Sequence, residues 1–117
     1  MRHIEADTQR AFIKFVRQVH PNLLYTIAPI NKTGIREAVR NKAMGYTPGT
    51  PDVIFFEPRG QYHGLLIEFK APDENLIPSQ RAFLQRASDL GYKTEVCFYA
   101  TEAVTKLESY LWSKKVG

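Results

Sequence analysis

The segment Gly64–Pro72, GLLIEFKAP, constrains the fold more than any other part of this 117-residue chain. Its apolar residues are typical of a buried β-strand, yet Glu68 and Lys70 stand within it. Side chains alternate along a strand, so these two charges point to one face while Ile67 and Phe69 point to the other. A buried charge is costly unless it is paired or binds a cation. We therefore expect the fold to provide partners for Glu68 and Lys70 on one face of a sheet.

A second acid precedes a neighbouring apolar segment. Residues 47–56, TPGTPDVIFF, pass from a turn into a strand, and Asp52 lies at the boundary. The connection PRGQYHG, residues 58–64, indicates a hairpin, so the two strands should pair antiparallel. Asp52 at the start of one strand would then lie near Glu68 toward the end of the other. Two converging carboxylates repel each other unless a cation lies between them.

Hard oxygen ligands favour Mg²⁺ or Mn²⁺. Asp52 and Glu68 are therefore candidate metal ligands, and the backbone carbonyl of Phe69 could supply a further oxygen. Lys70 could hold or activate a water beside them. The alternative is purely structural: Asp52 caps a strand, and Glu68 and Lys70 form a cross-strand pair. An isolated E-x-K is common, whereas its combination with Pro-Asp after a glycine turn is less so.

The rest of the chain alternates helical and strand patterns. The expected helices are 4–19, 35–44, 79–90 with Ser79 as N-cap, and a last helix capped by Thr101; the expected strands are 23–28, 52–57, 65–71 and 94–100. The order α-β-α-β-β-α-β-α predicts an α/β fold, a mixed sheet flanked by helices. Its length suits one domain over residues 1–117.

Composition and motifs exclude several classes of function. The net charge of +4 and the pI of about 9.3 lean toward a polyanionic partner. No phosphate-binding glycine loop and no H-E-x-x-H motif occurs, and the three histidines are scattered. Cys97 is the single cysteine, which excludes an intramolecular disulfide and a cysteine-based zinc site. We expect no membrane span, no small-molecule substrate and a cytoplasmic location.

The sequence resembles the PD-(D/E)xK nuclease superfamily through Pro51-Asp52 and Glu68-Phe69-Lys70. Within it, the chain is similar to the virus-type replication-repair nuclease (VRR-NUC) domain. The matching stretches are GTPDVIFF, GLLIEFKAP, PSQRAFLQRASDLGYKTEVCF and TEAVTKLESYL, and with the N-terminal helix they cover nearly the whole chain. The resemblance implies a restriction-endonuclease-like fold.

The resemblance also implies roles by position. Asp52 and Glu68 match metal-binding carboxylates, and Lys70 matches the lysine that positions or activates the attacking water. Adjacent carboxylates would raise the pKa of a lysine, so we favour positioning over general-base action. Gln80 matches a glutamine that supports the site. Glu5 matches an acidic position that can complete the metal shell.

Binding of DNA requires cations beyond the site. Arg36, Arg40 and Lys42 lie on the short helix before TPGTPD, and Arg81 follows Gln80; each could contact phosphates, and each could be merely solvated. The resemblance implies a metal-dependent, structure-selective endonuclease that nicks four-way (Holliday) junctions as a homodimer, in a bacterial or phage-infected cell. Two alternatives stay open: a non-catalytic nucleic-acid-binding module, and a subunit whose specificity comes from partners.

Overall fold

The computed structural model describes residues 4–28 and 35–115, with the backbone alone for residues 35–38. The elements are α1 (Ile4–Val19), β1 (Tyr25–Ile27), α2 (Ile35–Ala43), β2 (Val53–Phe55), β3 (Leu65–Phe69), α3 (Pro78–Asp89), β4 (Lys93–Cys97) and α4 (Ala100–Trp112). This order confirms the predicted α-β-α-β-β-α-β-α arrangement. The observed strands are shorter than expected at their ends.

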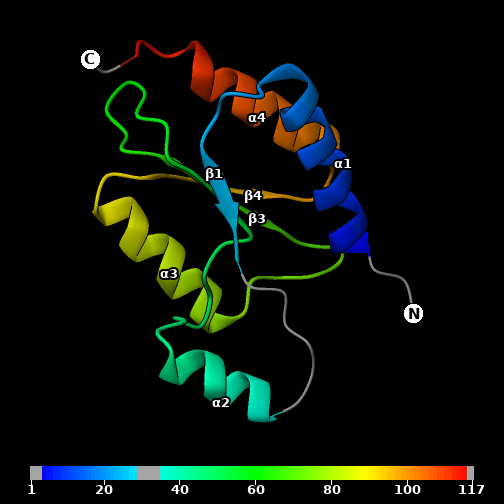
Figure 1. Ribbon diagram of the computed structural model, residues 1–117, viewed down its shortest axis with the longest axis vertical. Helices are drawn as coiled ribbons and strands as arrows, with labels where there is room; N and C mark the ends of the chain where they lie inside the picture. The colour runs from blue at the N-terminus through cyan, green and yellow to red at the C-terminus, as the bar shows by residue number, and fades with distance from the viewer. Residues whose placement is uncertain (1–3, 29–34, 116–117) are drawn as a thin grey trace.

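The strands form one mixed sheet in the order β1-β2-β3-β4 (Figure 1). β2 pairs antiparallel with β3, as the hairpin pattern predicts. β1 also pairs antiparallel with β2. β3 and β4 run parallel, because α3 carries the chain from the end of one back to the start of the other. β1 and β4 are the two edges of the sheet.

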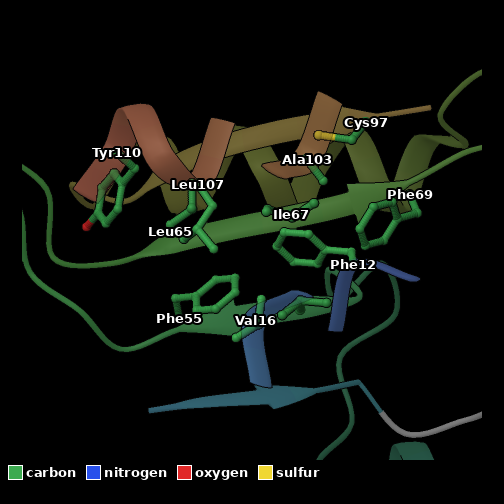
Figure 2. Close-up of a cluster of buried hydrophobic side chains, with 11 residues drawn as sticks. Phe12, Val16, Phe55, Leu65, Ile67, Phe69, Cys97, Ala103, Leu107 and Tyr110 are labelled. Atoms are coloured by element: carbon green, nitrogen blue, oxygen red, sulfur yellow. The ribbon is translucent and has the colours of Figure 1, made fainter. Parts of the chain in front are cut away.

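The hydrophobic core lies between one face of the sheet and the helices α1 and α4 (Figure 2). Ile67 and Phe69 point into it, which agrees with the alternation read from the sequence. Phe12 and Val16 of α1 are four residues apart, so they lie on one side of the helix and pack together against the sheet. Glu68 must then point to the opposite face, where α3 lies.

Two predicted helix caps are wrong. α3 begins at Pro78, so Ile77 and not Ser79 is its N-cap residue. Proline suits the first helical position because it lacks an N–H and has a helical φ. α4 begins at Ala100, one residue before Thr101. Instead of a threonine cap, the Glu102 carboxylate accepts the backbone N–H of Phe98 at 2.7 Å. After the end of α3, Gly91 has a positive φ, which favours glycine at this position.

Helix α2 stands apart from the body of the molecule, at the foot of Figure 1. It makes few contacts with any other element. Val39 within it and Met44 just after it are exposed. Within the described residues, no helix has the length and apolar character needed to cross a membrane.

Candidate active site

Two carboxylates meet where β2 begins and β3 ends. Val53 pairs with Ile67 across the antiparallel strands, so the residues just outside this pair, Asp52 and Glu68, are opposite each other. The Asp52 Oδ2 atom accepts the backbone N–H of Phe69 at 2.7 Å. Only 3% of Glu68 is exposed. The hairpin therefore brings together the two acids that the sequence singled out.

Gln80 in the first turn of α3 fixes the orientation of Glu68. Its Nε2 donates to Glu68 Oε2 at 3.1 Å, while its Oε1 accepts the backbone N–H of Ile77 at 3.0 Å. One side chain thus satisfies an otherwise free N–H at the start of α3 and holds a carboxylate of β3. Gln80 thus contacts Glu68, and its supporting role in the site stays a prediction.

The turn before Asp52 is docked directly on the start of α3. Gly49 has a φ of +87°, which favours glycine, and a Cβ there would overlap the backbone of Ser79. On its other side, the carbonyl of Asp52 accepts the N–H of Ala28 at 3.0 Å. Asp52 is consequently held from three directions, by β1, by β3 and by α3 through Gly49.

Burial raises the pKa of both acids. The pKa of Glu68 rises to about 9, first because the group is desolvated and then because of the charge and hydrogen bonding of Asp52. Burial also raises the pKa of Asp52, against the lowering effect of the Phe69 N–H bond. Without a cation, the pair therefore retains a proton near neutral pH.

Glu5 of α1 is a third acid at the site. Its pKa rises to about 7, mainly because of burial and then because of a hydrogen bond with Glu74. Glu74 in turn accepts the N–H of Ala71 at 3.1 Å. Glu5 thus faces Glu74 as well as the cleft. Its assignment as a metal ligand stays a prediction.

Lys70 lies beside all of these acids. Its positive charge lowers the pKa of Glu5, Asp52, Glu68 and Glu74. Lys70 is 8% exposed, and its backbone N–H donates to the carbonyl of Cys97 on β4. Among the described ion pairs none joins Lys70 to Glu68, so the simple cross-strand pair does not account for Glu68.

The donor set fits a divalent cation with oxygen preference. In the described part of the chain, no three His, Cys, Asp or Glu side chains gather closely enough to hold a metal. Mg²⁺, however, is commonly held by one or two carboxylates together with waters and phosphate oxygens. The N–H and C=O of one strand residue point to the same side, so the Phe69 carbonyl also points toward Asp52. Asp52, Glu68 and this carbonyl would supply oxygen ligands of this kind.

The acids open into a cleft of about 1390 Å³ between α1, β1, the turn before β2 and the start of α3. Of the predicted DNA-binding residues, Lys42 lines this cleft and Arg40 is exposed on α2. Arg81 is exposed and donates to the carbonyl of Leu76 at 3.1 Å. The side chain of Arg36 lies outside the described residues.

Sequence reasoning missed one wall of the cleft. Arg10, Lys14 and Arg17 of α1 line it together with Asp52 and Glu68. Their spacing of four and three residues was visible in the sequence, but nothing there indicated which side of α1 faces the acids. Glu74 was missed as well, because it lies in a loop and matches no recognised position.

Comparisons with known proteins identify the family and the fold. The model of the VRR-NUC domain family matches residues 6–98. A solved structure described as a VRR_NUC domain protein has a TM-score of 0.83 and 22% identity, covering 98% of this chain and 93% of the other. The comparison with curated proteins found no match. Since the family model spans most of the chain, including Asp52, Glu68, Lys70 and Gln80, the protein belongs to the VRR-NUC family and has the fold of a nuclease domain.

Proposed function

We propose that this chain is a metal-dependent, structure-selective DNA endonuclease that hydrolyses phosphodiester bonds and nicks four-way junctions as a homodimer. The observation that carries the proposal is the pairing of Asp52 with Glu68 at the ends of β2 and β3, within a wide cleft. Each carboxylate has one oxygen engaged, by Phe69 and Gln80 respectively, which orients the pair.

The proposed chemistry assigns a task to each residue. Asp52, Glu68 and the Phe69 carbonyl would hold Mg²⁺ or Mn²⁺, which when bound lowers the pKa of water and neutralises phosphate charge. Gln80 keeps Glu68 in place for this. Lys70 supplies a fixed positive charge near the reacting phosphate, where negative charge develops.

Binding of DNA and selectivity follow from the surroundings of the cleft. Lys42 on one wall and Arg40 nearby could contact phosphates beside the cleaved bond. A four-way junction has approximate twofold symmetry, and a C2 dimer would present two equivalent sites to it. Exposed apolar residues outside the cleft, among them Val39 and Met44 on and beside α2, offer surface for an interface between two copies.

The decisive experiment measures cleavage of a labelled four-way junction, a flap and a linear duplex by purified protein. We expect nicking with Mg²⁺ or Mn²⁺ and none with excess EDTA. Asp52→Asn and Lys70→Ala should each lower the rate by at least about 100-fold, while affinity for DNA in EDTA changes little. Asp89→Asn is the matched control, because this exposed acid at the end of α3 bonds to Gln85 and lies outside the cleft.

Undiminished cleavage in EDTA would reject the metal mechanism. Full activity of Lys70→Ala would reject the role given to Lys70. Binding of DNA without cleavage under any of these conditions would favour the alternative of a non-catalytic or partner-dependent subunit.

A further inference from the structure

The cleft has a basic wall that is separate from its acidic end. Arg10, Lys14 and Arg17 project into the cleft from α1, and all three are exposed. Residues three and four apart lie on one side of a helix. The opposite side of α1, with Phe12 and Val16, is buried in the core. The three cations therefore form a stripe whose direction is fixed by the packing of the helix.

The acidic end of the cleft lies at the start of α1. Glu5, at the start of α1, lies at the end of the cleft that holds Asp52 and Glu68. The cations follow toward the end of the helix. At 1.5 Å per residue, Arg17 lies about 18 Å along the helix axis from Glu5. The basic stripe itself, from Arg10 to Arg17, spans seven residues or about 10 Å. One strand of duplex DNA has a phosphate per about 3.4 Å of axis, so the stripe matches a run of about three phosphates.

Two of the three cations are oriented by hydrogen bonds. Arg17 Nε donates to the hydroxyl of Tyr25 at 3.1 Å, which ties the helix side chain to β1 across the cleft surface. The bond leaves the terminal amino groups of the guanidinium available to a phosphate. Arg10 forms an exposed pair with Asp7 at 2.7 Å, and such surface pairs contribute little.

We propose that α1 is the phosphate-binding wall of the cleft. Arg10, Lys14 and Arg17 would contact successive phosphates of one DNA strand as it leads away from the bond held at Asp52 and Glu68. The identity of the polyanion as DNA rests on the proposed function. The wall explains how a cleft with buried acids at one end attracts a polyanion at all.

The test removes the three charges without touching the acids. The variant Arg10→Gln, Lys14→Gln, Arg17→Gln is compared with wild type by fluorescence anisotropy on a labelled 20-base-pair duplex and a labelled four-way junction, both in EDTA. The salt dependence of log K should become shallower by roughly two to three units, because each lost phosphate contact removes about 0.9. The variant Arg10→Gln, Lys14→Gln keeps the bond between Arg17 and Tyr25. Its salt slope should change by about two-thirds as much as that of the triple variant.

The matched control removes three other charges: Lys93→Gln, Lys106→Gln, Lys114→Gln. Lys93 and Lys106 pair with Glu95 on β4, at the sheet edge opposite β1, and none of the three lines the cleft. A general effect of net charge would lower affinity equally in both triple variants, and that result would overturn the inference. So would an unchanged salt slope in folded α1 variants, even where wild type cleaves DNA. A reduced salt slope that is confined to the α1 variants supports the inference. If wild type binds DNA in this way but fails to cleave it, the proposed catalysis is rejected and the inference about α1 stands.

Discussion

At the scale of single residues, the site contains acids whose burial destabilises the folded protein when they are charged. Glu68 is nearly fully buried, and Gln80 supplies one neutral hydrogen bond to its carboxylate. Neutral donors do not compensate fully for a desolvated negative charge beside Asp52. This buried negative charge destabilises the metal-free protein. A divalent cation between the two acids would neutralise the charge and remove the destabilisation.

The burial of Glu68 predicts that the stability of the metal-free protein falls as pH rises. The pKa of Glu68 is raised from 4.5 to about 9 in the folded protein. Its contribution to stability is therefore present at low pH and is lost as pH rises from about 4.5 toward 9, since the folded state keeps a proton that the unfolded state releases. Glu68→Gln removes this dependence while keeping an oxygen that can accept from Gln80.

The measurement is the melting temperature in EDTA at pH 5 and pH 8. We expect Glu68→Gln to exceed wild type by several degrees at pH 8 and by less at pH 5, given about 4 °C per kcal/mol for a domain of this size. Mg²⁺ should raise the melting temperature of wild type and not that of the variant. A difference between the two proteins that is equal at both pH values would contradict the assignment of this destabilisation to Glu68.

At the scale of elements, the site depends on how three separate segments meet. The alternation of charges in β3 and the hairpin to β2 were predictable from the sequence, because strand pairing follows from period-two patterns and a short connection. The order of elements was predictable for the same reason. The basic side of α1 was not, since a helix pattern shows which side is apolar but not which polar residues face a cleft.

The contact between the Gly49 turn and α3 could not be predicted from the sequence either. TPGTP indicates a turn but not what the turn packs against. In the structure, Gly49 lies against the backbone of Ser79, next to Gln80, so it sets the position of Asp52 relative to Glu68. Gly45 offers a matched comparison, because it also has a positive φ, of +108°, but a Cβ there would meet nothing within 4 Å.

We therefore expect Gly49→Ala and Gly45→Ala to differ. Both introduce strain of about 1 kcal/mol at a positive φ. Only Gly49→Ala must also push the turn away from α3, which moves Asp52, so its cleavage rate should fall at least tenfold, against less than threefold for Gly45→Ala. Rates are compared at a temperature where circular dichroism shows both variants folded. Equal rates would show that the turn does not position Asp52.

At the scale of the whole molecule, the question is how a 13.4 kDa domain could distinguish a junction from a duplex. One cleft can hold one bond and a short run of phosphates, and these features are common to every DNA substrate. Selectivity for shape requires a fixed angle between two duplex arms. A twofold dimer provides that angle because it holds two clefts in one fixed relation.

The apolar surface of the described residues is compatible with such a dimer. Trp112, the chain's single tryptophan, is 91% exposed at the end of α4, and Val39 and Met44 are exposed on and beside α2. The two sets lie on different helices, at opposite ends of the view in Figure 1, so a twofold interface would use one set or the other. A stable interface should bury at least about 1,000 Å² in total and leave both clefts open.

We predict that light scattering at micromolar concentration reports about twice the mass of 13.4 kDa. The same preparation should nick a four-way junction faster than a linear duplex of the same arm sequence, since only the junction engages both clefts at once. Mixing wild type with an excess of Asp52→Asn should then produce heterodimers that nick one strand of the junction but seldom cut its symmetric partner. A monomer that cleaves both substrates at equal rates would reject the dimer, and it would leave a nuclease domain whose substrate is chosen by a partner protein.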